Sequence, residues 1–142
     1  MRILLPILLV ALMAAPDVVA QEVAFPDSAS GAAATAWIAL VDSADYVSSW
    51  DEAAPDFKAN VSQQQWSQAA AQVRGALGTL QERTLARAER IAQIPGLPDG
   101  DYLLVEYVSR FAQMPRAIET HVMAFGEDAT WRTIGYFVRP SQ

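Results

Sequence analysis

Apolar side chains recur three and four residues apart in the first half of the chain, which is the spacing of one face of an α-helix. A helix that begins at Ser30 or Gly31 would align five of them on one side: Ala33, Trp37, Leu40, Val41 and Ala44. Tyr46 and Trp50 extend this stripe into a second helical stretch. Pro55 marks a break after it, because proline cannot continue a helix.

A further helix is predicted after this break. Ser62 and Gln65 match a capping box, in which the two residues satisfy each other's backbone N–H groups at a helix start. Gly78 is well placed to end the helix. Its apolar side consists of Trp66, Ala69, Ala70, Val73, Ala76 and Leu77. Aromatic residues at helical spacing most often pack in a core, so we expect three tryptophans to be largely buried: Trp37, Trp50 and Trp66.

The second half of the chain is predicted to form an antiparallel sheet. The segment "YLLVEYVSRFA" has the aromatic and β-branched content of a strand, and it follows the turn "PGLPDGD". Residues 82–94 favour a helix by propensity, but we predict a strand, because it could pair back across that turn as a long hairpin. Two more strands, at 117–125 and 131–138, are joined by "GEDAT". The order predicts an α+β fold with N-terminal helices packed on the sheet.

The first 20 residues have the order of a secretory signal peptide. One basic residue precedes an apolar run, and small side chains stand at Val18 and Ala20, before the expected cleavage site. The run is shorter than the roughly 20 residues of a membrane-spanning helix, so we expect no membrane span once the signal is removed. We therefore predict a periplasmic or secreted protein with a flexible tail at 21–31 and a single domain at 32–142.

Composition excludes several classes of function. The net charge is -6, which argues against nucleic acid as a partner, because phosphate binding needs a basic surface. The chain contains no cysteine and one histidine, so a disulfide framework and a thiolate metal site are excluded. It also has no glycine-rich phosphate loop and no Gly-x-Ser-x-Gly nucleophile elbow. We expect neither a metal nor a cofactor.

Spaced aromatic residues and glycines occur in the segments "AWIALVDSADYVSSW", "FKANVSQQQW", "LGTLQER", "PGLPDGDY" and "WRTIGYFVR". This pattern resembles the exported bacterial family called domain of unknown function 4019. The resemblance brings no assigned activity. It implies a fold similar to the nuclear-transport-factor-2-like (cystatin-like) superfamily, in which helices and a curved sheet form a cone around a pocket. That superfamily includes isomerases, dehydratases and pure binding domains. The turn "GEDAT" departs from the Asp-Gly turn that such families often have.

The two faces of the last hairpin follow from strand alternation. A turn centred on Asp128 would place His121 opposite Gly135 and would direct one set of residues toward the helices: Ile118, Val122, Ile134, Tyr136 and Val138. The other face would carry Glu119, His121, Met123, Phe125, Trp131, Phe137 and Arg139. We expect this apolar face to be covered by a second copy or another partner. If the chain's own helices cover it instead, the assignment of faces is inverted.

Six residues are candidates for a functional site. Glu106, Glu119 and His121 could carry acid/base chemistry if the protein were an enzyme. A structural or surface role is favoured for each. The candidates for ligand or partner binding are Arg83, Glu119, His121, Trp131 and Phe137. For Arg83 a carboxylate pair that fastens the helices to the sheet is favoured over the grip of an anionic ligand.

These observations predict an exported binding or protein-interaction domain without catalysis. Its partner would be another copy of the chain, a cell-envelope protein or a small apolar ligand. One alternative is a cofactor-free isomerase or hydratase that uses a carboxylate in a pocket. Another is a structural accessory module of an envelope complex.

Overall fold

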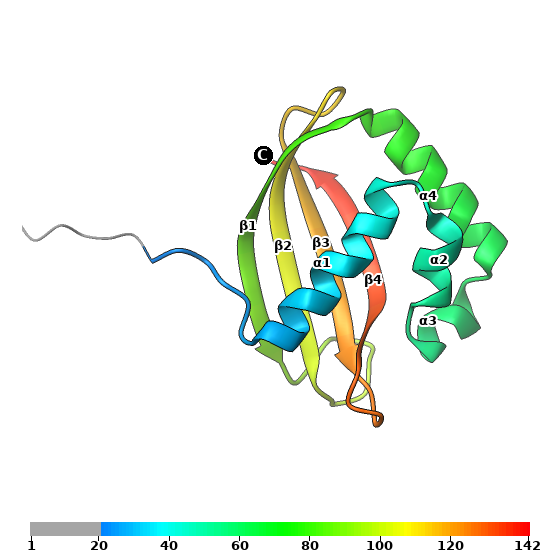
Figure 1. Ribbon diagram of the computed structural model, residues 1–142, viewed down its shortest axis with the longest axis vertical. Coiled ribbons are helices and arrows are strands. Elements are labelled where there is room, and N and C mark those ends of the chain that lie inside the picture. The colour runs from blue at the N-terminus through cyan, green and yellow to red at the C-terminus, as the bar shows by residue number, and fades with distance from the viewer. Residues whose placement is uncertain (1–20) are drawn as a thin grey trace, which may run out of the picture.

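A computed structural model describes residues 21–142 of the chain. It contains four helices, α1 (Ser28–Asp42), α2 (Tyr46–Asp51), α3 (Pro55–Asn60) and α4 (Gln63–Leu77), followed by four strands, β1 (Leu80–Ile91), β2 (Tyr102–Phe111), β3 (Ala117–Phe125) and β4 (Trp131–Pro140). The strands form one antiparallel sheet in the order β1-β2-β3-β4 (Figure 1). The predicted α+β order is confirmed, and the ambiguous segment after residue 80 is a strand. The predicted signal peptide lies outside the described residues.

Helix α1 begins earlier than the apolar spacing indicated. The Asp27 carboxylate accepts a hydrogen bond from the backbone N–H of Ser30 at 2.8 Å and so caps the first turn. Residues 28–31, which we predicted as the end of a flexible tail, are therefore helical. Phe25, also within the predicted tail, packs against the core.

The limits of α4 follow the sequence signals. Ser62 and Gln65 form both hydrogen bonds of the predicted capping box. Gly78 ends the helix with a φ of 75°, a conformation that strains residues with a Cβ. Pro55 does not simply interrupt the chain: it occupies the first turn of α3, where a missing N–H costs nothing.

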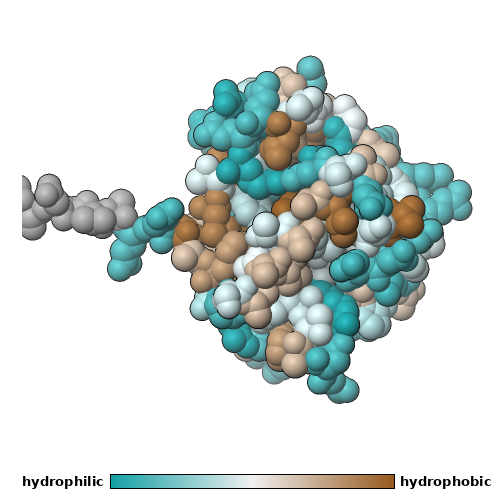
Figure 2. Space-filling model, in the orientation of Figure 1, coloured by the Kyte–Doolittle hydropathy of each residue, from teal (hydrophilic) through white to brown (hydrophobic). Residues whose placement is uncertain are grey.

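The helices are divided between two positions relative to the sheet. Figure 1 shows α1 crossing one face of the sheet, while α2, α3 and α4 lie beyond the edge strand β4. The side that α1 covers shows only small, separate apolar patches among hydrophilic residues (Figure 2). Trp37 and Trp66 are buried, as predicted, at 4% and 8% exposure, whereas Trp50 is only half-buried.

A β-bulge interrupts the alternation of side chains in β4. Val122 pairs with Gly135, but Met123 pairs with Thr133, so Ile134 is an extra residue on β4. An extra residue shifts all later side chains of its strand to the opposite face. Trp131 and Thr133 before the bulge and Tyr136 and Val138 after it consequently pack against the same layer of helices and core residues.

The predicted faces of the last hairpin were wrong for β3 and for Trp131 of β4, which is buried in the core with Ala34 of α1 and Met123. Glu119, His121 and Met123 point toward the helices and are buried at 1% exposure or less. The chain's own helices cover this face, and no partner is needed there. Phe137, which alternation placed with these residues, lies on the other side of the sheet at 63% exposure. His121 pairs with Tyr136 and not with Gly135, because strict alternation takes no account of the bulge.

Candidate functional site

Charged and polar side chains gather between α1, α4 and the sheet. We call this group the polar cluster; its members are Asp42, Arg74, Arg83, Ser109, Glu119 and Tyr136. Glu119 lies at its centre with a fully buried side chain. The cluster joins α1 and α4 to all four strands of the sheet.

Arg83 links helix and sheet through two carboxylates. Its Nε and Nη2 donate to Glu119 at 2.7 and 2.8 Å. Its Nη1 and Nη2 donate to Asp42, at the end of α1, at 2.6 and 2.9 Å. Planar guanidinium and carboxylate groups match each other in such bidentate pairs. These are the contacts that we expected of an Arg that fastens the helices to the sheet.

Glu119 has no oxygen available for a substrate. Arg83 donates to both carboxylate oxygens, and Ser109 and Tyr136 donate one hydrogen bond each. Burial by itself would raise the pKa of Glu119, but these hydrogen bonds outweigh it and hold the pKa below the usual range. A general base must accept a proton and reach its substrate, and this carboxylate is arranged to do neither.

His121 lies beside the polar cluster in an apolar setting. Its ring stacks on Trp37 with centroids 4.7 Å apart, and its Nε2 is 2.7 Å from Thr133 Oγ1. Its buried Nδ1 has no hydrogen-bond partner among the described residues. Burial, with a smaller contribution from the positive charge of Arg83, lowers the pKa of His121 to about 3. The imidazole is therefore neutral at physiological pH. Because the ring is fully buried, no substrate can reach it.

The structure separates the other predicted site residues from this cluster. Glu106 lies on the opposite face of the sheet, where its side chain is 28% exposed and 3.9 Å from Arg87. Trp131 is buried against Phe125, with the Arg90 guanidinium 5.4 Å from its ring centre. Only Arg83, Glu119 and His121 come together. No group of metal-ligating side chains occurs within residues 21–142.

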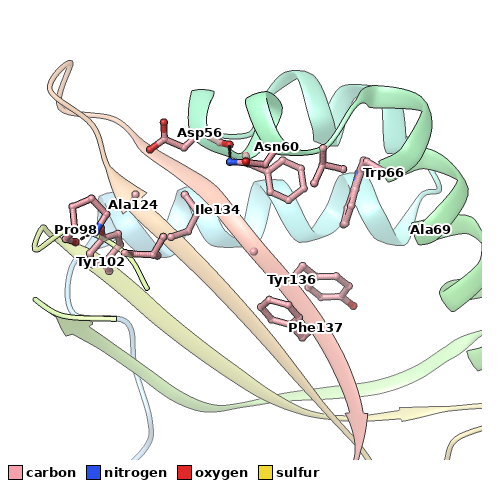
Figure 3. A pocket seen from close by; sticks show the side chains of 14 residues that line it. Asp56, Asn60, Trp66, Ala69, Pro98, Tyr102, Ala124, Ile134, Tyr136 and Phe137 are labelled. Carbon is pink, nitrogen blue, oxygen red and sulfur yellow. Dashed lines mark hydrogen bonds between the residues drawn. The ribbon is translucent and has the colours of Figure 1, made fainter. Parts of the chain in front are cut away.

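A second region, which the sequence did not reveal as a site, lies along β4, between α3 and α4 on one side and, in the larger cavity, residues of the β1–β2 loop, β2 and β3 on the other. Two adjoining cavities of about 500 and 280 Å³ share Trp66, Ala69, Tyr136 and Phe137. We call them together the β4–α4 groove; Figure 3 shows the side chains that line the larger cavity. Its other lining residues are Asp56, Phe57, Asn60, Val61, Leu97, Pro98, Tyr102, Ala124, Ile134 and Gly135 in the larger cavity and Ala70, Val73, Arg74 and Val138 in the smaller.

The groove is apolar because its aromatic residues satisfy their polar atoms elsewhere. The Trp66 ring N–H donates to Ser49 Oγ at 2.9 Å, and the Tyr136 hydroxyl donates to Glu119. These two residues therefore contribute only the apolar surface of their aromatic rings to the groove. Asp56 and Asn60 lie together at the α3 end, where the Asn60 amide donates to the Asp56 carbonyl (Figure 3).

Part of the predicted apolar stripe of α4 forms a wall of this groove. Trp66, Ala70 and Leu77 are buried, but Ala69 is exposed and Val73 is 44% exposed. Both exposed residues line the groove. Their spacing on the stripe gave the correct side of the helix. It could not show that the sheet stops short of covering that side, and no other signal in the sequence marked these residues.

The comparison with known families agrees with the sequence pattern. The family described as "Protein of unknown function (DUF4019)" matches residues 33–136, which is most of the chain, and the protein belongs to this family. No curated protein matches the chain significantly. In the part of the chain that the structure describes, no helix combines the length and the apolar character needed to cross a bilayer.

Proposed function

We propose that this protein is a binding domain without catalysis, and that it holds an apolar ligand in the β4–α4 groove. The groove itself carries the proposal: its larger cavity, of about 500 Å³, falls within the range of ligand-binding pockets, and its lining is mainly apolar. Exposed apolar surface of this kind, between two rigid elements, is costly in water unless something covers it.

The arrangement of charged groups favours binding over catalysis. Two of the three candidate acid or base residues, Glu119 and His121, are buried beneath α1 and contact neighbouring side chains. The third, Glu106, lies on the opposite face of the sheet and does not line the groove. The charged side chains of the groove are Asp56, at the α3 end, and Arg74. Arg74 is paired with Asp42 at 2.9 Å. An isomerase-like reaction would need a carboxylate among apolar walls that raise its pKa, and we assign no residue to that role.

Titration with the neutral fluorescent probe N-phenyl-1-naphthylamine tests this function. Ala69→Trp fills the groove from an exposed position on α4, and Ala71→Trp places the same side chain at an exposed position that does not line it. We expect the first variant to bind the probe at least 10-fold more weakly than wild type and the second to bind it normally. Equal affinities for all three proteins would contradict the proposal.

We also propose that the mature protein is exported and begins near Gln21. The support is the order of charged, apolar and small residues in the first 20 positions. Mass spectrometry of the protein purified from its native cells gives the terminus. A chain that keeps Met1 and stays in the membrane fraction would contradict this.

We further propose that the fold is similar to that of the nuclear-transport-factor-2-like superfamily. An antiparallel sheet with α1 on one face, and an apolar groove along the edge strand β4 beside α3 and α4, support this. Superposition of an experimental structure on members of that superfamily is the test. Strand connections that do not match theirs would contradict it.

A further inference from the structure

We infer that the ligand of the β4–α4 groove is an extended polypeptide segment, which pairs with the free edge of β4 as a fifth strand. This inference rests on the proposed function and specifies its ligand. It combines three features of the groove: the free backbone groups of an edge strand, an apolar wall opposite them, and an acidic residue at one end.

The first feature is the edge of the sheet itself. Strand β4 is the last strand, and its only neighbour in the sheet is β3. The Thr133 carbonyl accepts a hydrogen bond from the Ala54 N–H at 2.9 Å, so the backbone groups of Thr133 point away from β3 and toward the helices. A neighbouring backbone N–H already pairs with this edge at one point.

The direction of the later backbone groups follows from the register. In an antiparallel pair, positions that bond across the pair alternate with positions whose N–H and C=O point outward. With Thr133 pointing outward, the pairs after the bulge place the outward groups at Tyr136 and Val138. Both residues line the groove.

These backbone groups decide the chemistry of the ligand. Backbone N–H and C=O groups that are covered by a ligand must find hydrogen-bond partners, because leaving buried polar groups unpaired is unfavourable. An alkyl chain or an aromatic ring offers no such partner. Another extended backbone offers a donor and an acceptor at the matching spacing, which is how peptides add to exposed sheet edges.

The walls of the groove set the side chains of the added strand. Strand residues alternate between the two faces, so one set would contact Ala69 and Val73 of α4 and the other would lie beside Phe137. From Ile134 to Val138 the edge is about 14 Å long, room for about five residues. Apolar residues at alternate positions fit this arrangement.

The acidic residue at the α3 end of the groove favours a basic residue at that end of the peptide. Asp56 lies at the α3 end and forms no ion pair within residues 21–142. The whole chain carries a net charge of -6. A basic residue beside the apolar stretch of the peptide would complement both.

Selection from random twelve-residue peptides displayed on phage tests the inference. The purified protein is the target, with selection against binding to the Ala69→Trp variant. We expect enriched sequences with alternating apolar residues and a flanking Lys or Arg. A synthetic peptide of the enriched sequence should bind wild type and Ala71→Trp at least 10-fold more tightly than Ala69→Trp. Hydrogen exchange should slow at the amides of Tyr136 and Val138 when it binds.

A matched peptide separates strand pairing from simple apolar contact. Methylation of the backbone nitrogens that face β4 keeps every side chain, and we expect it to weaken binding at least 10-fold. The inference is overturned if no sequence distinguishes wild type from Ala69→Trp, or if the methylated peptide binds as tightly. It is also overturned if the two amides stay unprotected, or if Ala69→Trp disrupts a dimer that wild type forms. If N-phenyl-1-naphthylamine binds in the groove but no peptide does, the proposed function stands and only this inference is refuted.

Discussion

The polar cluster beneath α1 and the β4–α4 groove differ in chemistry and in how far their side chains are paired or covered. In the cluster, Arg83 and Glu119 meet in bidentate geometry, and the buried carboxylate accepts from three side chains. In the groove, apolar residues such as Val73 and Phe137 remain open to solvent. The residues that resemble catalytic groups hold the fold together, and residues that resemble core form the open site. The two regions are therefore told apart by whether their side chains already have partners within the protein, more than by residue type.

The largest expected effect comes from removing the centre of the polar cluster. Glu119→Ala leaves the Arg83 guanidinium partly uncompensated in a buried position, and we expect a loss of about 3 to 5 kcal/mol in the free energy of unfolding. Urea denaturation measures it. Glu106→Ala, on the open face of the sheet, is the matched control and should change stability by no more than about 0.5 kcal/mol. Similar losses for both variants would show that the buried pair of Glu119 and Arg83 contributes no more than the exposed contact of Glu106 with Arg87.

Acid should destabilise the protein through His121. Its pKa is lowered from the ordinary 6.5 to about 3 in the folded state, so the unfolded chain binds the proton first. Stability therefore falls as the pH drops from about 6.5 toward 3, by about 2 kcal/mol between pH 7 and pH 5.

Urea denaturation across that range, on wild type and His121→Gln, tests the effect. The variant should lose this dependence. The lowered pKa values of Asp42 and Glu119 affect stability mainly at lower pH. A carboxylate with a lowered pKa loses most of its stabilising contribution as the pH falls below the ordinary pKa of the group, near 4. An equal slope between pH 7 and pH 5 in both proteins would show that His121 is not the group responsible.

Much of the fold and the carboxylate pairing of Arg83 were open to prediction from the sequence, whereas the orientation of the last hairpin and the groove were not. The capping box at Ser62 and the strand beginning near Leu80 follow from local spacing and from pairing across a turn. The bidentate pairing of Arg83 with a carboxylate was expected from the geometry of its side chain. These features depend on short-range order or on the chemistry of one residue.

The orientation of the last hairpin was not predictable in the same way. One extra residue, Ile134, shifts the alternation of β4, and an isoleucine at this position does not predict a bulge. The groove was missed for a related reason. Apolar spacing on α4 shows which side of the helix is apolar, but whether the sheet reaches Ala69 depends on where β4 ends the sheet.

A smaller effect is expected at the junction after α1, which positions Asp42 for the polar cluster. Ala44 has a φ of 60°, a left-handed conformation that strains any residue with a Cβ. Ala44→Gly should raise the free energy of unfolding by about 1 kcal/mol. The same change within a regular helix, Ala71→Gly in α4, should lower it by about 1 kcal/mol. Thermal denaturation of both variants checks the opposite signs; a loss in both would show that Ala44 is unstrained.

The smallest effect on stability is expected in the groove wall. Val73 is 44% exposed, so Val73→Ser should change the free energy of unfolding by less than about 0.5 kcal/mol. The same substitution should weaken the binding of N-phenyl-1-naphthylamine, because it makes the wall polar. A large loss of stability without an effect on binding would place Val73 in the core.

The most direct test of the account is to map where an apolar probe binds. Two-dimensional nuclear magnetic resonance of the labelled protein, titrated with N-phenyl-1-naphthylamine, reports each backbone amide and each tryptophan ring N–H. We predict that the largest shifts occur at Ala69, Val73 and Phe137 and at the Trp66 ring. Shifts centred instead on Arg83, Glu119 and His121 would contradict the account, because they would place the binding site in the polar cluster.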